Sequence, residues 1–256
     1  MSRELIRFAA LGDSASCGVG DPTPDGWRGW AQILADAMAG DHYVSFLKLA
    51  VPGACAFDVR RDQLATAIEH RPVIASLVVG LNDAVRSSWD PDRLREDLLY
   101  AAAELAAEGT LLMTVRFHDH ARVLGLPSIL ARPLRRRIEV LNAIYDEVHE
   151  RYGLIQLDLG RFPQVYFRDM WAVDRLHPSE KGHRWIARQA GELLRAEGLD
   201  FTLPSLACTS SRVRARELAR TLVVDVAPWL GRRACDLGPW AARQAVRRGR
   251  ERLLVA

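Results

Sequence analysis

The chain has 256 residues, of which 49% are hydrophobic and 26% are charged, and its net charge is +3. This composition excludes a disordered chain, and the length allows one large domain or one domain with an appendage. No apolar run is long enough to span a membrane and the N-terminus lacks the long apolar region of a signal peptide, so we expect a cytoplasmic protein.

Five short apolar runs are predicted to be strands. They cover residues 5–11, 43–50, 73–79, 110–115 and 154–159. The segments between them show helical spacing of apolar residues or a helix start signal, such as Pro91 directly after Asp90. The expected helices cover residues 27–38, 57–70, 134–151 and 178–199, and a further helix begins at Pro91. Gly125, Pro127 and Pro133 predict a loop before the helix at residue 134.

Strands that alternate with helices indicate an α/β fold with a parallel sheet. Near-continuous apolar strands indicate that both faces of this sheet are covered. The alternation stops near residue 203, and no strand signal follows. We therefore expect a main domain over residues 1–203 and a helical extension over residues 204–256 that packs on it. Its expected helices cover residues 211–230 and the segment after Pro239.

The extension carries the positive charge of the chain. Residues 205–256 contain eleven Arg and four Asp or Glu, a net charge of +7, which leaves −4 for residues 1–204. A helix face in solvent explains such a charge run, and docking to an acidic partner or a membrane surface is the alternative. We expect no nucleic-acid partner, and the sequence leaves the oligomeric state open.

The four cysteines are Cys17, Cys55, Cys208 and Cys235, and none of them lies in a C-x-x-C pair or a zinc-type cluster. Free thiols in a reducing compartment are therefore expected rather than disulfides. We expect no metal and no organic cofactor. Cys17 and Cys55 follow two of the strand ends described next, where they would line a pocket.

Short polar and glycine-containing segments follow the predicted strands. Ligands of open parallel sheets bind beyond the carboxyl ends of the strands, so these segments are candidates for a site. The first three are Gly12-Asp13-Ser14, Pro52-Gly53-Ala54 and Gly80-Leu81-Asn82-Asp83, and the fourth is Asp174-Arg175-Leu176-His177. Together they supply one edge of the sheet with a hydroxyl, a backbone N–H, a carboxamide, a carboxylate and an imidazole.

These groups suit nucleophilic acyl chemistry. A serine hydroxyl needs an adjacent base, and His177 can take the proton of Ser14. Asp174, three residues before His177, can bind the other ring nitrogen and orient the imidazole. The oxyanion of a tetrahedral intermediate needs hydrogen-bond donors. The candidate donors are the N–H of Ser14, the N–H of Gly53 and the side-chain amide of Asn82.

The four segments resemble the four blocks of the SGNH (GDSL-type) hydrolases, in the same order and spacing over about residues 5–200. The resemblance is to the bacterial esterase and lipase-like branch. It implies a flavodoxin-like three-layer α/β/α sandwich around a central five-stranded parallel sheet, and a triad of the serine, aspartate and histidine just named. The family usually has Leu, Phe or Tyr directly after the serine and often Thr soon after, whereas this chain has Ala15, Ser16 and Cys17, which alters the expected acyl pocket.

Other side chains near these segments are expected to be structural. Asp13 is expected to accept neighbouring backbone N–H groups, and Asp83 to brace its loop. His118 and His120 make a poor metal site by themselves, so we expect their loop to form part of the substrate rim. His183 is expected on the surface or in packing. The tryptophans are expected in the core (Trp27, Trp30) or at the border of the cleft (Trp89, Trp171).

We therefore expect a serine hydrolase that cleaves a small-molecule carboxylic ester through an acyl-enzyme intermediate. The same site would serve an acyltransferase with an alcohol or amine acceptor, because the sequence does not distinguish water from another nucleophile. A catalytically silent binding module is the third hypothesis, and the intact set of residues argues against it. The identity of the ester is not determined, since one fold hosts many substrates.

Overall fold

The computed structural model of the chain describes residues 3–153 and 155–208. At its centre lies a five-stranded sheet in which every neighbouring pair of strands is parallel. The strands are β1 (Leu5–Gly12), β4 (Tyr43–Lys48), β5 (Ile74–Val78), β6 (Leu111–Arg116) and β7 (Ile155–Asp158). Their spatial order is β4-β1-β5-β6-β7, which is the flavodoxin-like arrangement. The predicted α/β fold with a five-stranded parallel sheet is confirmed.

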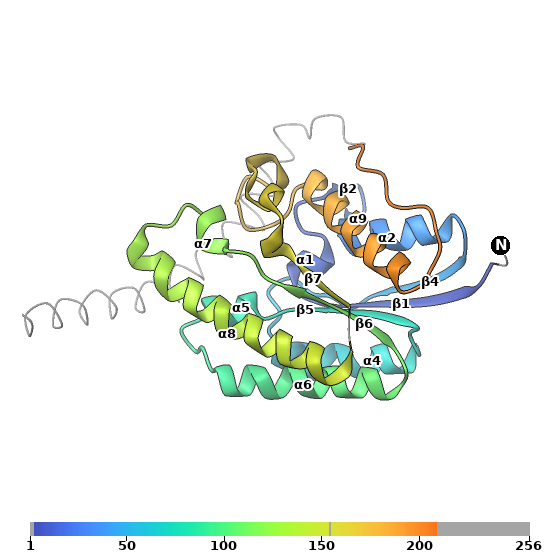
Figure 1. Cartoon of the computed structure of the whole chain (residues 1–256), viewed down its shortest axis with the longest axis horizontal. Coiled ribbons are helices and arrows are strands. Elements are labelled where there is room, and N and C mark those ends of the chain that lie inside the picture. Colours follow the sequence, from blue (N-terminus) through green and yellow to red (C-terminus); the bar gives the residue numbers. More distant parts are fainter. Residues whose placement is uncertain (1–2, 154, 209–256) are drawn as a thin grey trace, which may run out of the picture.

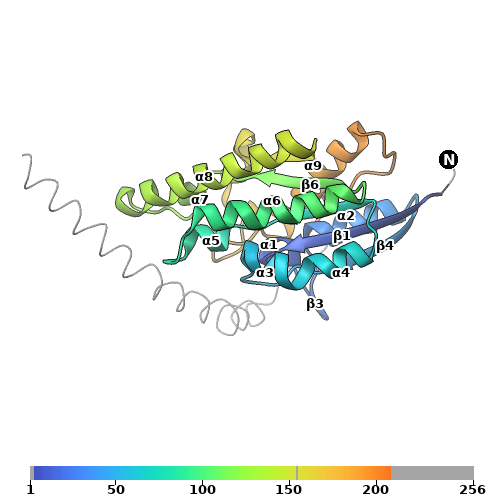
Figure 2. The ribbon, with the colours of Figure 1, turned by 90° about the horizontal axis from the view of Figure 1, so that it is seen from below.

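Helices cover both faces of this sheet (Figure 1). On one face α2 (Gly29–Ala39) packs against α9 (Glu180–Ala196), and the other face carries α4 (Leu64–Glu69), α6 (Pro91–Ala107) and α8 (Ser128–Tyr152). Figure 2 looks onto this second layer and shows α6 between α4 and α8. Because helices cover both faces, all five residues of β5 are buried, as expected for an apolar strand of a parallel sheet.

Shorter elements connect the sheet to these layers. Three short helices follow the strand ends: α1 (Ser14–Cys17) after β1, α5 (Leu81–Val85) after β5 and α7 (His120–Val123) after β6. α3 (Ala56–Asp58) leads into a π-helical turn, η1 (Val59–Gln63), and then into α4. A small hairpin of β2 (Pro22–Thr23) and β3 (Gly26–Trp27) precedes α2. The 3-10 turns η2 (Leu159–Arg161), η3 (Pro163–Tyr166) and η4 (Arg168–Met170) precede α9.

Some element boundaries differ from the sequence prediction. The helix predicted from residue 134 begins at Ser128, so Pro133 lies inside α8 rather than in a loop. Pro133 is the sixth residue of α8, beyond the four N–H groups that lack an intrahelical partner, so the helix lacks one backbone hydrogen bond at this position. The helix predicted from Pro178 begins at Glu180, because the Ser179 side chain caps it by accepting the N–H of Gly182.

After α9 the chain runs back beside the same helix. Arg184 Nη1 donates to the carbonyl of Ser205 at 3.2 Å, and Arg188 Nη1 donates to the carbonyl of Pro204 at 3.3 Å. Phe201 is buried, with 4% of its surface exposed. The described residues that follow α9 are therefore attached to the main domain by side-chain and backbone contacts.

The helices predicted over residues 211–230 and after Pro239 lie outside the described residues. The division of the chain at residue 203 therefore stays a prediction. Within residues 3–153 and 155–208, every helix is too short or too polar to cross a bilayer.

Candidate active site

Ser14 lies at the point where β1 leaves the sheet. It is the first residue of α1, and Asp13 caps this helix by accepting the N–H of Ala15 at 3.0 Å. Gly12 directly before the cap has φ = +139°, and a Cβ atom there would lie 2.1 Å from the carbonyl oxygen of Val78 in β5. Only glycine allows this close approach of the two strand ends. The turn thus presents the serine hydroxyl at the carboxyl edge of the sheet, between β1 and β5.

A buried glutamine, which the sequence analysis missed, holds this strand end. The Gln63 side chain accepts the N–H of Gly12 at 2.8 Å and donates to the carbonyl of Gly12 at 3.0 Å. Gln63 is the last residue of η1 and only 3% exposed. Hydrophobic periodicity assumes regular α-helix, so it gives no sign of a π-helical turn or of the inward direction of this side chain.

Ser14, His177 and Asp174 form one line of hydrogen bonds. His177 Nε2 is 2.9 Å from Ser14 Oγ, and His177 Nδ1 is 2.7 Å from Asp174 Oδ2. The other carboxylate oxygen of Asp174 accepts the backbone N–H groups of Leu176 and His177. Burial raises the pKa of Asp174, but the hydrogen bonds and the charge of His177 outweigh it, so the pKa lies below its ordinary value. The carboxylate is therefore ionised and oriented toward the imidazole.

Asn82 lies beside this line at the start of α5. It is 5% exposed, and its Nδ2 donates to Asp13 Oδ2 at 3.2 Å and to the carbonyl of Ala54 at 3.1 Å. Ser14, Asn82 and His177 all line one cavity. The amide therefore connects the three strand-end segments that the sequence analysis proposed as neighbours.

Gly53 lies in the loop that joins β4 to α3, and it does not line this cavity. Its φ is +84°, and its carbonyl accepts a hydrogen bond from Arg86 Nη2 at 3.1 Å. Within the described part of the chain, neither the Gly53 N–H nor the Ser14 N–H donates a hydrogen bond.

The two aspartates beside the predicted site residues make the contacts expected of structural groups. Burial raises the pKa of Asp13 to about 6 despite the hydrogen bond from Ala15. Burial also raises the pKa of Asp83, whose Oδ2 accepts the N–H of Ala56 at 3.2 Å. Asp83 was expected to brace its own loop, and the contact in the structure is instead with Ala56, at the end of the loop that contains Gly53.

The cavity beside Ser14 measures about 70 Å³ and has mostly apolar walls. Its lining includes Leu81, Val85, Phe117, Trp171 and Ile186. This volume is about half that of an engineered protein cavity that holds a benzene ring, so a small apolar group fits it.

The outer residues predicted for the cleft have mixed outcomes. Trp171 lines the cavity, whereas Trp89 packs elsewhere, with the Arg137 guanidinium 5.6 Å from its ring. Neither Cys17 nor Cys55 lines the cavity, and Cys55 faces a separate polar pocket of about 230 Å³. In the described residues Cys17, Cys55 and Cys208 are free thiols.

His118 and His120 lie in the wall of the cavity rather than on an exposed rim. Each is 3% exposed, their ring centroids are 4.5 Å apart, and Trp171 contacts both rings. Burial lowers the pKa of His120 to about 4 and holds that of His118 well below its ordinary value, so both are neutral at pH 7. No cluster of three or more His, Cys, Asp or Glu suited to a metal ion occurs in the part of the chain that the structure describes.

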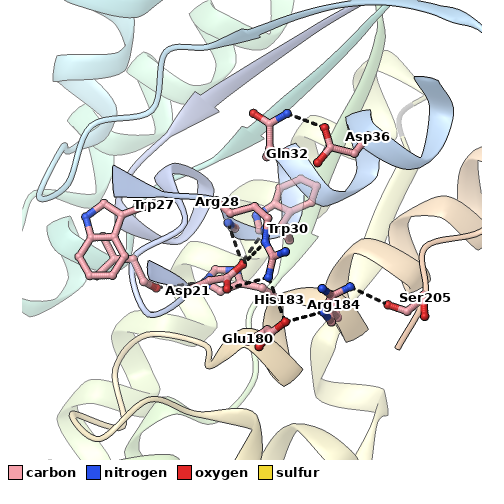
Figure 3. Close-up of polar contacts among 12 residues, drawn as sticks. Asp21, Trp27, Arg28, Trp30, Gln32, Asp36, Glu180, His183, Arg184 and Ser205 are labelled. Atoms are coloured by element: carbon pink, nitrogen blue, oxygen red, sulfur yellow. Dashed lines mark hydrogen bonds and ion pairs between the residues drawn. The ribbon is translucent and has the colours of Figure 1, made fainter. Parts of the chain in front are cut away.

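His183 is a packing residue, which was one of its two expected roles. It is fully buried in α9, where Nδ1 accepts the N–H of Trp30 at 3.2 Å and Nε2 lies 3.0 Å from the carbonyl of Val19 (Figure 3). Trp30 is buried as predicted, and Trp27 is half-buried. His183 therefore ties the segment after α1 to the helix that follows His177.

Comparisons with known proteins agree with this fold. A family model described as a GDSL-like lipase/acylhydrolase family matches residues 10–185, which include Ser14, Asn82 and His177. A comparison with curated protein sequences found no significant match.

Solved structures with a similar fold include three hydrolases. A psychrotrophic esterase, EstA, from Pseudoalteromonas sp. is 15% identical with a TM-score of 0.60, over 75% of this chain and 97% of that one. A catalytic mutant of an acetylxylan esterase from Geobacillus stearothermophilus is 16% identical with a TM-score of 0.61, over 74% and 94%. A lipase/acylhydrolase from Enterococcus faecalis is 19% identical with a TM-score of 0.60, over 80% and 100%. Because the family model covers more than two thirds of the sequence, the chain belongs to the GDSL-like lipase/acylhydrolase family.

Proposed function

We propose that the protein is a serine hydrolase that cleaves carboxylic esters through an acyl-enzyme intermediate. The observation that carries the proposal is the continuous hydrogen-bonded line from Ser14 Oγ through His177 to Asp174. In the first step, Ser14 Oγ attacks the ester carbonyl carbon and His177 Nε2 takes its proton. Asp174 keeps the imidazole in the tautomer that accepts this proton and stabilises the resulting cation.

The attack forms a tetrahedral intermediate. In it the carbonyl oxygen of the ester becomes negative, and the N–H groups of Ser14 and Gly53 with the amide of Asn82 donate to it. Because Asn82 Nδ2 already contacts Asp13 and Ala54, we expect it to exchange one of these acceptors for the oxyanion. His177 returns the proton to the leaving alcohol, which departs and leaves the acyl group on Ser14.

Water completes the cycle. His177 removes a proton from the water as it attacks the acyl carbon, and the proton then returns to Ser14 Oγ as the acid is released. The small apolar cavity suits a short acyl chain, so short-chain esters are the first substrates to test. A product analysis with an alcohol or amine added would show whether water is the natural acceptor.

The test compares Ser14→Ala with Ser16→Ala. Hydrolysis of 4-nitrophenyl acetate and butyrate should fall at least about 1000-fold in Ser14→Ala, because the nucleophile is removed. Ser16 is a buried serine of the same helix whose hydroxyl has no hydrogen-bond partner among the residues that the structure describes, so Ser16→Ala should retain activity. Retained activity in Ser14→Ala, with circular dichroism unchanged, would overturn the proposal.

A further inference from the structure

A cluster of buried charges lies beside the candidate site and takes no part in the proposed chemistry (Figure 3). Arg28 donates from Nε and Nη2 to the two carboxylate oxygens of Asp21, at 2.8 and 3.0 Å, and from Nη2 to Glu180 Oε1 at 3.0 Å. Arg184 Nε donates to the same Glu180 oxygen at 2.9 Å. Asp21, Glu180 and Arg184 are each less than 9% exposed.

The cluster joins the two segments that supply the nucleophile and the base. Asp21 and Arg28 lie in the stretch that runs from the end of α1 to the start of α2, seven or more residues after Ser14. Glu180 is the first residue of α9, three residues after His177. In sequence these segments are 152 residues apart, so the hydrogen bond between Ser14 and His177 depends on contacts that hold them together.

Backbone packing at the same junction leaves little room for adjustment. Gly20 has φ = +102°, and a Cβ atom on it would lie 2.0 Å from the carbonyl oxygen of Pro178 and 3.4 Å from the His177 side chain. Asp21 Oδ2 also accepts the N–H of Gly29 at 3.2 Å, which closes the loop that begins directly after Gly20. A small shift of this loop therefore moves the chain that packs directly against the base.

The chemistry of the cluster suits a role in orienting the two segments better than a role in stabilising the fold. Charges that are taken out of water lose hydration, so a buried ion pair contributes little net stability compared with apolar residues of the same size. Guanidinium has a planar fork of donors that can engage two carboxylates at once in a defined orientation. Arg28 uses this property, because it binds one carboxylate from each of the two segments.

We propose that Arg28 is a positioning residue for the reaction assigned above. By binding Asp21 and Glu180 together, it holds the loop after α1 against the start of α9 and keeps Ser14 Oγ within hydrogen-bond distance of His177 Nε2. The inference rests on the proposed function, because it concerns the alignment of the proposed nucleophile and base. Arg28 acts through Asp21 and Glu180 and is not itself catalytic.

The molecule contains a matched control on the opposite face of the sheet. Arg60 in η1 also binds two carboxylates, Asp97 at 2.9 Å and Glu96 at 3.0 Å, and Asp97 is buried. None of these three residues lines the cavity beside Ser14. Arg60→Ala therefore removes a similar set of ion pairs without touching the junction between Ser14 and His177.

The experiment measures kcat, KM and melting temperature for Arg28→Ala, Arg28→Lys and Arg60→Ala with a 4-nitrophenyl ester. We expect Arg28→Ala to lower kcat about 100-fold, as for a misplacement of about 1 Å between reacting groups, with KM within about 3-fold. Arg60→Ala should keep kcat within about 3-fold of the unmodified protein, even if its melting temperature falls as much as that of Arg28→Ala. Arg28→Lys should resemble Arg28→Ala, because an ammonium cannot bind both carboxylates in the same geometry.

Two further readouts separate positioning from a structural effect. Guanidinium at millimolar concentration should restore part of kcat to Arg28→Ala, since the Arg28 side chain is 23% exposed and its place is reachable from solvent. The rate at which a fluorophosphonate labels Ser14 should fall in parallel with kcat. No rescue is expected for Arg60→Ala.

The inference is overturned if folded Arg28→Ala or Arg28→Lys keeps kcat within about 3-fold of the unmodified protein, or if Arg60→Ala loses as much. If Arg28→Ala does not fold, Arg28→Lys carries the prediction alone. Failure of the proposed function gives a different result, namely activity that survives Ser14→Ala. The two outcomes are therefore distinguishable in the same assay.

Discussion

Arg28 and Arg60 each bind two carboxylates, but the regions around them differ in how deeply their polar groups are buried. The Arg28 cluster lies at the carboxyl edge of the sheet, where Asp13, His120 and His183 are all buried and have displaced pKa values. The Arg60 cluster belongs to the layer of α4, α6 and α8, where most charged pairs are exposed. At the carboxyl edge the loss of one buried polar group should have a large effect on activity or stability, because water cannot replace the lost partner there. Substitution of an exposed charged group in the helical layer should change melting temperature and kcat little.

The largest effect is expected from Asp174→Asn. An amide at this position no longer accepts the ring N–H of His177 in the same way and does not stabilise its cation, so kcat should fall about 10³–10⁴-fold. Asp169→Asn is the control, because Asp169 is exposed and pairs with Lys181. Steady-state kinetics that found both variants equally active would contradict the triad.

Asn82→Ala should have the next largest effect. Removal of one oxyanion donor lowers kcat about 10²–10³-fold, with a smaller change in KM. The amide also binds Asp13 and Ala54, so the melting temperature is measured in parallel. A lower melting temperature with unchanged kcat would show that Asn82 only braces the strand ends.

Acid should destabilise the carboxyl edge through His183. Burial lowers its pKa from 6.5 to about 4, so the unfolded chain binds an extra proton between these values. His183 therefore does not lower the free energy of unfolding above about pH 6.5. As the pH falls from 6.5 toward 4, its protonation in the unfolded chain lowers the free energy of unfolding by about 3 kcal/mol.

Urea unfolding at about pH 7 and 4.5 tests this expectation with His183→Gln. Glutamine does not titrate, and it can accept from Trp30 and donate to Val19. The variant should therefore lose less stability on acidification than the unmodified protein. Asp13 works in the opposite direction, since burial raises its pKa to about 6, but it is common to both proteins. Equal losses would exclude His183 as a source of acid sensitivity.

The smallest effect is expected in the helical layer. Glu147 of α8 accepts hydrogen bonds from Arg95 and Arg151 at the surface. Exposed ion pairs of this kind contribute little, so Glu147→Gln should shift the melting temperature by less than about 2 °C and leave kcat unchanged. A fall in kcat would mean that the helical layer is coupled to the site.

The same contrast explains which parts of the fold and of the candidate site could be predicted from the sequence. The strands were predictable because apolar runs that end near glycine or proline determine their place, although β4, at the edge of the sheet, is exposed or half-buried along its length. Ser14, Gly53 and Asn82 were predictable as neighbours because each lies shortly after a strand, and parallel strands bring their carboxyl ends to one edge. Asp174 and His177 were placed there because they come after the last strand and ahead of a helix, although η2, η3 and η4 separate them from β7. The hydrogen bonds between Ser14 and His177 and between His177 and Asp174 agree with that expectation.

What could not be predicted depends on long-range side-chain direction. Gln63 reaches Gly12 only because η1 is a π-helical turn, and Arg28 finds Glu180 only when α2 and α9 are packed together. His118 was expected in a loop at the substrate rim, yet it is buried and its ring packs against Trp171. Hydrophobic periodicity describes one element at a time and contains no information on such contacts.

The most direct test of the account is covalent labelling of Ser14. A fluorophosphonate reacts only with a serine that a neighbouring base activates, and mass spectrometry of the digested protein identifies the modified residue. The account predicts one label per chain on the peptide that contains Ser14, no label in Ser14→Ala, and loss of ester hydrolysis in step with labelling. Full hydrolysis by a protein that carries no label, or a label on another serine, would contradict it.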